Sequence, residues 1–473
     1  MIYLDREHAK PLYEQIYDQL KDDILSGRIA GGTRLPATRR LALDLVVGRN
    51  TVENAYEQLL VEGYVSSRVG SGYTVNDLTL PTAGKSVRRG SEPEAAPAAE
   101  PLYDFRLNRM DQFSFPALSF RKHLDATVRA LETTAPYNYP PRQGDERLRK
   151  AIAAHLYSAR GIECSPENIV IICGHQYSLD VVCTVLGAKP IRVAMEDPGY
   201  AGAHALFRLR NAEMLPIGIE RDGADVASAI RSNANLLYLT PSHQFPTGAV
   251  LSIQKRLMAI DWARRTGGYI VENDYDSDLR YNTRPIPSLY SLDQSDRVIY
   301  VGTLSRPIAL ELGLAYIVLP DALIKSYRKM YSLHYNSVPP ILQAATASYI
   351  ESGVCAQDLD RFRIRCRRKH DVMLSETARI FGDKVAVSAA GAGLYLIFTV
   401  TDGRDSDELM ALALEKGLKV YPMRGNWLDP LHAPGNQVLL GYGGLPVEEI
   451  PSALALLYEA WFGGKARETN GKE

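Results

Sequence analysis

Short β-prone runs alternate with helical patterns from Leu102 onward, and this alternation constrains the fold more than any other feature of the chain. The β-prone runs read NIVIICG, RVAMED, EMLPIGI, NLLYLTP, GGYIVEND, RVIYVG and LAYIVLP. The helical patterns include DERLRKAIAAHLYSARG, YSLDVVCTVLG and SIQKRLMAIDWARRTG. Alternation sustained over roughly 200 residues predicts a mostly parallel sheet and an α/β fold class.

The pattern changes after Pro320. A long helical stretch leads to two further β-prone segments, VAVSAAGAGLYLIFTV and GLKVYPM, and to a last helix, VEEIPSALALLYEAWF. We therefore expect a small α/β subdomain at about 345–464 within a C-terminal domain of residues 102–464. The basic run Arg361–His370 is predicted to be a solvated or dimer-facing helix surface, with a second DNA-contacting patch as the alternative.

The first 76 residues predict three helices and a β-hairpin. PLYEQIYDQLKDDILSG has apolar residues at four-residue spacing and ends at a glycine. A second helical pattern is expected to turn Leu41, Leu45 and Val46 inward, and RNTVENAYEQLLVEGY is the third. Two β-prone pairs flank SSRVGSG, a hairpin signal. This arrangement is that of a winged helix-turn-helix.

Composition narrows the classes of partner. Residues 77–101 are rich in Ala, Pro, Ser and charge, which predicts a flexible linker. The net charge is −1, so any DNA contact must come from a local patch. Five cysteines without CxxC spacing indicate neither a disulfide framework nor a zinc site. Neither a secretion signal nor a membrane span is recognisable, and we expect a cytoplasmic protein without a membrane partner.

The N-terminal motifs LPATRRLA, GRNTVENAYEQLLVEG and VGSG resemble those of the GntR-type winged helix, in the same order. The resemblance implies that two arginines of the second helix contact DNA, that three residues open the recognition helix in the major groove, and that the rest form the wing. These are Arg39, Arg40, Arg49, Asn50, Thr51, Arg68, Gly70 and Gly72. Gly48 replaces the family's serine and removes a helix-capping hydroxyl. The alternative is that these arginines are solvated charges on a protein-interaction module.

The C-terminal motifs resemble fold type I, aspartate-aminotransferase-like proteins, and in particular the MocR-type regulators, which fuse a GntR-type winged helix to such a domain. The motifs that carry the resemblance are YNYPPRQGDERLRKAIAAHL, EDPGYAGA, LTPSHQFPTG, VENDYDSDLRY, VGTLS and LLGYGGL. The resemblance implies large and small aminotransferase-like subdomains. It also implies a homodimer that binds repeated or palindromic operator half-sites.

Much of a pyridoxal phosphate (PLP) site matches the family's motifs. The resemblance implies phosphate binding by Gly174, His175 and Gln176 at a helix start, with help from the hydroxyls of Thr303 and Ser305. It places a tyrosine ring against the pyridine, and a histidine and a second tyrosine beside the ring's phenolic oxygen. These three residues are Tyr200, His243 and Tyr275.

Three replacements argue against PLP chemistry. Asn273 stands where the family has the aspartate that pairs with the pyridinium nitrogen, and Asp274 is expected to face the other side of its strand. Arg306 stands at the lysine position, and an arginine cannot usefully form a Schiff base. Gly313 replaces a phosphate-binding arginine. We expect no covalent cofactor and no catalytic residue.

The sequence therefore predicts a DNA-binding transcriptional regulator with a degenerate aminotransferase-like domain. That domain would serve dimerisation and would sense a small anionic effector, with non-covalent PLP or another small anion in the cleft. Four alternatives stay open. Arg306 only bridges within a vestigial core, or the domain is solely a dimerisation scaffold. The protein is a PLP-responsive regulator of the MocR type, or it is a PLP-dependent aminotransferase with an accessory DNA-binding module.

Overall fold

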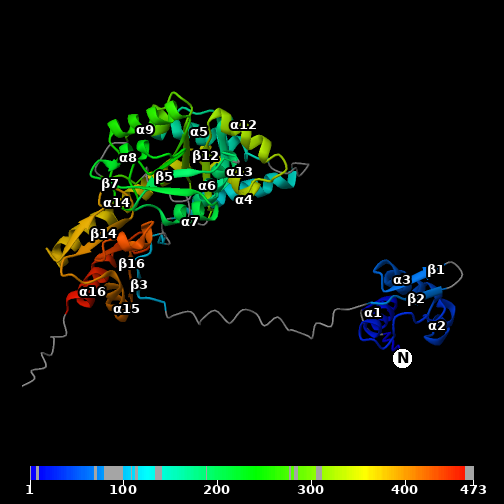
Figure 1. Ribbon diagram of the computed structural model, residues 1–473. Helices are drawn as coiled ribbons and strands as arrows, with labels where there is room; N and C mark the ends of the chain where they lie inside the picture. Colours follow the sequence, from blue (N-terminus) through cyan, green and yellow to red (C-terminus); the bar gives the residue numbers. More distant parts are fainter. Residues whose placement is uncertain are drawn as a thin grey trace, which may run out of the picture. The chain divides into compact units, whose positions relative to one another are not determined.

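The computed structural model of the protein describes residues 2–6, 10–68, 72–78, 100–107, 109–111, 115–133, 141–187, 189–275, 279–281, 286–304 and 312–463. The chain divides into two compact units, Met1–Ala98 and Ala99–Glu473 (Figure 1). Among the described residues, no helix combines the length and the apolar character needed to cross a bilayer.

The N-terminal unit is a winged helix-turn-helix, as predicted. Its elements are α1 (Leu12–Leu25), α2 (Thr38–Asp44), α3 (Arg49–Val61) and the antiparallel strands β1 (Val65–Arg68) and β2 (Gly72–Val75). The apolar positions at helical spacing form a common core because they lie on the inner faces of α1 and α3. The core includes Ile16, Leu20, Ile24, Val52, Ala55, Tyr56 and Leu59.

One residue predicted for this core lies on the surface. The helix α2 ends at Asp44, and Val46 has a left-handed backbone with φ of +53° and a side chain that is 74% exposed. The prediction that Val46 faces inward is therefore wrong. The carbonyl of Val46 accepts a hydrogen bond from Arg6 at 2.8 Å, so the turn between α2 and α3 is held through its backbone.

The larger subdomain of the C-terminal unit is built on a seven-stranded sheet of order β4-β12-β11-β10-β9-β5-β6. Each β-prone run named above forms one of its strands. β12 is antiparallel to both of its neighbours and all other neighbouring pairs are parallel, so the mostly parallel sheet is confirmed. The strands are β4 (Ile169–Cys173), β5 (Arg192–Glu196), β6 (Glu213–Ile217), β9 (Leu236–Leu239), β10 (Tyr269–Asn273), β11 (Val298–Thr303) and β12 (Leu314–Val318).

Successive strand residues enter different cores on the two faces of this sheet. Val271 of β10 packs with residues of α6, α7 and α12, whereas Ile270 packs with residues of α8 and α9. The helices are α4 (Ala117–Thr133), α5 (Glu146–Arg160), α6 (His175–Val185), α7 (Ala201–Leu209), α8 (Val226–Arg231), α9 (Ile253–Thr266), α10 (Leu289–Leu292), α12 (Asp321–Met330) and α13 (Pro340–Glu351). A short hairpin pairs β7 (Ile219–Glu220) with β8 (Gly223–Ala224).

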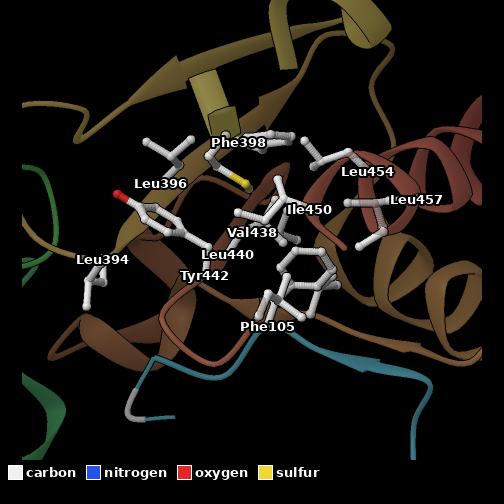
Figure 2. Close-up of a cluster of buried hydrophobic side chains, with 14 of the residues drawn as sticks. Phe105, Leu394, Leu396, Phe398, Val438, Leu440, Tyr442, Ile450, Leu454 and Leu457 are labelled. Atoms are coloured by element: carbon white, nitrogen blue, oxygen red, sulfur yellow. The ribbon is translucent and has the colours of Figure 1, made fainter. Parts of the chain in front are cut away.

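The smaller subdomain surrounds a four-stranded sheet of order β13-β14-β17-β16. Its core residues come from the sheet and from the helices around it, and Phe105, far upstream in the chain, packs among them (Figure 2). The elements are α14 (Val354–Phe381), β13 (Val385–Ser388), β14 (Tyr395–Val400), α15 (Ser406–Glu415), β16 (Tyr421–Pro422), β17 (Gln437–Gly441) and α16 (Ile450–Phe462). In addition, β15 (Leu418–Lys419) pairs in parallel with β3 (Tyr103–Asp104).

Residue 345, near the expected start of the small subdomain, lies in α13, whose buried residues share a core with α5 and the large sheet. The first residues of α14, Val354 and Cys355, pack against the same core, and later residues of α14 enter the core of the smaller sheet. The basic run on α14 is only partly a solvated surface. Lys369 is buried and pairs with Asp111 at 2.6 Å, and buried His370 stacks on Tyr281 at 4.2 Å.

Residues 279–281, which we call the crossing segment, follow strand β10 of the large sheet but pair with the small subdomain. Arg280 forms a β-bridge with Ala392, and the backbone N–H of Gly393 donates to the carbonyl of Leu279 at 2.9 Å. The hydroxyl of Tyr281 donates to the carbonyl of Gly393 at 2.7 Å. The crossing segment thus joins the two subdomains by backbone pairing.

Candidate DNA-binding surface and effector pocket

The predicted recognition residues open α3. Arg49 and Asn50 are exposed and Thr51 is half-buried. Gly48 is the N-cap and supplies no side-chain hydrogen bond, as expected for a glycine in place of serine. The Nε of Arg49 lies 2.6 Å from Oε1 of Glu53, one turn further along the same helix. This pairing holds the guanidinium at the helix start, where it is accessible to a ligand.

The other predicted DNA-binding residues lie on α2 and on the hairpin. Arg39 and Arg40 are exposed on α2, and Arg68 pairs with Gly72 across the strands. Gly70 lies outside the described residues.

Arg34 was not among the residues predicted for this surface. It pairs with Thr74 through a β-bridge. A Cβ on Gly72 would lie 3.5 Å from Nε and from Nη2 of Arg34, so the guanidinium covers this glycine, whose φ is +80°. The sequence signal that could have identified Arg34 is its position directly before the LPATRR motif.

In the C-terminal unit, four predicted ligand-binding residues line one hollow. Gly174 follows β4 with φ of +77° and forms the N-cap of α6, and its N–H donates to the carbonyl of Gly313 at 2.7 Å. The first N–H groups of a helix have no partner within it and suit an anion. The hollow has a volume of about 380 Å³ and is lined by Cys173, Gly174, His175, Gln176, Tyr177, Asp180, Tyr200 and Leu206.

A chain of hydrogen bonds connects this hollow to Asn273. The Nδ2 of Asn273 lies 2.9 Å from the hydroxyl of Tyr238, which lies 3.0 Å from Nε2 of His175. Burial lowers the pKa of His175 to about 4 and raises that of Tyr238 well above its usual range. Both side chains are therefore neutral at physiological pH. Tyr238 was not predicted, because a buried strand tyrosine looks like any other core residue in sequence.

Asp274 faces the opposite side of the sheet, as strand alternation predicts. One of its carboxylate oxygens lies 2.9 Å from Nη2 of Arg160 and accepts a hydrogen bond from the hydroxyl of Tyr300 at 2.6 Å. The Arg160 and Asp274 side chains are 5% and 0% exposed. Arg160 also donates to the hydroxyl of Ser242, and Arg280 donates to the carbonyl of Ser242 at 3.0 Å. These hydrogen bonds to Ser242 fix the backbone next to His243.

His243 and Tyr275 lie together where the subdomains meet. The hydroxyl of Tyr275 donates to the carbonyl of His243 at 3.1 Å and lies 3.4 Å from the hydroxyl of Tyr395 on β14. The Phe245 ring links them to the hollow, because it packs against Tyr275 and against Tyr200, with ring centroids 6.1 Å apart in both pairs. The predicted residues thus form two groups joined by aromatic contacts.

The remaining predicted positions lie at the end of β11. The hydroxyl of Thr303 donates to the carbonyl of Leu314 at 3.2 Å and so connects the end of β11 to the start of β12. Ser305 and Arg306 lie outside the described residues. Gly313 has φ of +58°, a backbone conformation that favours glycine over the arginine of the family motif.

Comparisons with known proteins agree with these two units. The model of bacterial regulatory proteins of the gntR family matches residues 12–75, and that of aminotransferase class I and II matches residues 108–428. Several relatives are similar along almost the whole chain, and two of them are described here. The uncharacterized HTH-type transcriptional regulator YhdI of Bacillus subtilis (strain 168) is 33% identical over 97% of this chain and 97% of its own. The probable rhizopine catabolism regulatory protein MocR of Rhizobium meliloti is 33% identical over 100% of this chain and 97% of its own.

A solved structure supports the fold of the larger unit. LysN, an alpha-aminoadipate aminotransferase of Thermus thermophilus complexed with N-(5'-phosphopyridoxyl)-L-leucine, matches with a TM-score of 0.67 at 25% identity. The match covers 76% of this chain and 92% of that one. With both domain models matched in order and relatives similar over nearly their full length, the chain belongs to the GntR family of bacterial transcriptional regulators, in the MocR-type group that carries an aminotransferase class I and II domain.

Proposed function

We propose that this regulator binds its operator as a homodimer and that the hollow at the start of α6 senses a small anionic effector. The observation that carries the proposal is the convergence of Gly174, His175, Gln176 and Tyr200 on one hollow of about 380 Å³. A helix N-terminus supplies N–H donors for an anionic group, and Tyr200 supplies an aromatic face. These features suit a phosphorylated aromatic ring such as PLP, or another small anion.

We propose further that any PLP is held without a covalent bond. This proposal takes Arg306, which follows the VGTLS run, as the residue at the family's lysine position, and Asn273 as a neutral amide at the position of the family's carboxylate. PLP supplies an aldehyde and an electron sink when bound, but a protein without the lysine and the aspartate would use neither. The residues of the hollow fit binding, and the replacements argue against transamination.

The homodimer proposal rests on the fold type. Proteins of fold type I are typically dimers, and a dimer carrying two winged helices would match two operator half-sites. Each winged helix would place the start of α3 in the major groove, with Arg39, Arg40, Arg49 and Asn50 toward the DNA. Residues 1–76 contain nine Lys and Arg residues against ten Asp and Glu residues, so the unit has no excess positive charge. Pairing of two weak modules would therefore supply much of the affinity.

A thermal-shift screen of the full-length protein tests the effector proposal. We expect PLP or another phosphorylated small molecule to raise the melting temperature, whereas amino acids alone leave it unchanged. Gln176→Ala should leave the DNA affinity of the free protein intact and weaken the shift. If no anion stabilises the protein or alters operator binding, the domain is only a dimerisation scaffold.

The competing function is a PLP-dependent aminotransferase with an accessory DNA module, which the similarity to LysN favours. That function requires a lysine-bound cofactor, whose visible absorption band is removed by borohydride. The band, together with transaminase activity abolished by one lysine substitution, would overturn the proposal. Activity that persists without any particular lysine would not, because it would not depend on covalently held PLP.

A further inference from the structure

Residues 2–6, which we call the N-terminal arm, pair with α1 as a strand pairs with the edge of a sheet. The N–H of Tyr3 donates to Oε1 of Gln19 at 2.8 Å, and Nε2 of Gln19 donates to the carbonyl of Tyr3 at 2.6 Å. Gln15 makes the same two hydrogen bonds with Asp5, both at 2.9 Å. Two glutamines one helical turn apart therefore match backbone groups that recur at every second residue of an extended segment.

The other residues of the arm anchor it and extend it to the helix-turn-helix. Ile2 and Leu4 pack against the hydrophobic core of the N-terminal unit. The next even-numbered residue, Arg6, reaches the turn between α2 and α3, where its Nη2 donates to the carbonyl of Val46 at 2.8 Å. The arm thus connects the first helix to the turn that precedes the recognition helix.

This turn has the hydrogen bonds of a Schellman motif but an unfavourable residue at its centre. The N–H of Val47 donates to the carbonyl of Ala42 at 3.0 Å. The N–H of Val46 donates to the carbonyl of Leu43 at 3.2 Å. Val46 holds the left-handed position of the motif, with φ of +53°. Glycine is usual there, and a β-branched side chain fits that conformation poorly, so the turn is strained.

The hydrogen bond from Arg6 opposes this strain. The direction of a carbonyl follows the backbone angles of its residue, so a donor fixed on the Val46 carbonyl favours the left-handed conformation. The carbonyl also lies at the C-terminal end of α2, where a cation is favourable. Gly48, the N-cap of α3, follows two residues later. The conformation at Val46 therefore sets the direction in which α3 leaves the turn.

We propose that Arg6 is a positioning residue for DNA recognition, and that the N-terminal arm holds it on the Val46 carbonyl to fix the angle at which α3 enters the major groove. This proposal rests on the proposed binding of α3 in that groove. Strained residues persist where the surrounding structure determines them, and they concentrate at functional elements. A shift of α3 disturbs contacts with base edges more than the general attraction to phosphates, so Arg6 acts on sequence specificity.

Fluorescence anisotropy on the full-length protein tests this role. It compares a duplex selected by the wild-type protein with a scrambled duplex, at several salt concentrations. Arg6→Ala should weaken binding to the selected duplex about fivefold, change binding to the scrambled duplex by less than about twofold, and leave the salt dependence of log K unchanged. Arg28→Ala is the matched control, because Arg28 is an exposed arginine of the same unit that pairs with Asp23. It removes the same charge and should change neither affinity.

Two further variants show whether Arg6 acts through the turn. Val46→Gly relieves the strain, because glycine adopts a positive φ without steric cost. In that background Arg6→Ala should weaken the selected duplex by less than about twofold. Gln15→Ala keeps Arg6 but loosens the arm, and should weaken the selected duplex about two- to threefold. Circular dichroism checks that the variants fold, and Gln15→Ala in the two Val46 backgrounds decides the outcome if Arg6→Ala does not fold.

The outcomes separate this proposal from the DNA binding on which it rests. A salt slope reduced by about one, with both duplexes weakened alike, would show that Arg6 contacts phosphate and would overturn the positioning role. So would unchanged affinity of Arg6→Ala for the selected duplex, or a loss that keeps its full size in the Val46→Gly background. These results leave DNA binding standing. If the wild-type protein selects no duplex, the proposed DNA binding falls and this proposal falls with it.

Discussion

Removal of the Asp274 carboxylate should destabilise the C-terminal unit more than any surface substitution. Two unit charges 2.9 Å apart attract by roughly 6 kcal/mol at an effective dielectric constant of about 20, and much of this offsets the desolvation of the two groups. In Asp274→Asn the Arg160 guanidinium stays buried without its counter-ion. We expect a loss of about 3–5 kcal/mol in the free energy of unfolding.

The surroundings place the expected loss toward the upper end of that range. Burial lowers the pKa of Arg280, and the nearby charge of Arg160 lowers it further, whereas Asp274 acts in the opposite direction. Without Asp274, the two guanidinium groups repel each other with less compensation. Asp274 therefore stabilises the positive charge of two buried arginines.

Urea unfolding followed by tryptophan fluorescence measures this loss, because all three tryptophans, Trp262, Trp427 and Trp461, lie in the C-terminal unit. Asp261→Asn is the matched control: its carboxylate pairs with Arg264 and Arg265 on the surface and should contribute less than about 1 kcal/mol.

A double variant checks the mechanism. Arg160→Met combined with Asp274→Asn removes both charges and should recover at least about 2 kcal/mol relative to the sum of the single losses. If Asp274→Asn is no more destabilising than the surface control, the buried ion pair does not stabilise the fold and the reasoning is refuted.

Three further predictions concern other parts of the chain. Arg49→Ala should weaken binding to a DNA duplex selected by the wild-type protein and reduce the salt dependence of log K by about one, measured by fluorescence anisotropy; an unchanged salt slope would mean that Arg49 does not contact phosphate. Burial raises the pKa of Glu196 from 4.5 to about 7, so its contribution to stability is present below about pH 4.5 and is lost as the pH rises through about 7. Glu196→Gln should therefore gain stability relative to wild type between those pH values, and a constant difference would contradict this. Gly313→Arg should not restore a phosphate site but should lower the melting temperature. A side chain at φ of +58° costs about 1–2 kcal/mol, and its Cβ would lie 3.4 Å from Sγ of Cys173. A variant as stable as wild type would show that the loop relaxes.

The elements that sequence patterns predicted best are those with a single strong periodicity. Strands β9 and β12 of the large sheet are continuous apolar runs, and they formed where predicted because a strand buried on both faces needs apolar residues at every position. The same alternation rule placed Asp274 opposite Asn273. By contrast, Val46 continued the apolar pattern of α2, but the helix ended before it, since helix ends depend on the turn that follows.

The features that the sequence did not predict depend on contacts between distant segments. Phe105 joins the core of a subdomain whose other members begin far later in the chain, and no local pattern indicates that partner. Tyr238 and Arg160 carry the two hydrogen-bonding networks around β10, yet one occupies an ordinary core position and the other ends a helix. Their roles follow only from the residues that the sheet brings beside them.

The crossing segment 279–281 has a consequence for how the domain can be divided. It is covalently continuous with the strand that presents Asn273, yet its backbone pairs with residues 391–393 of the small subdomain. A truncated protein that ends after β12 would keep every strand of the large sheet but would leave this segment without its partners. The proposed effector pocket therefore cannot be separated from the small subdomain: a sensor module transplanted to another DNA-binding domain must include the chain through α16.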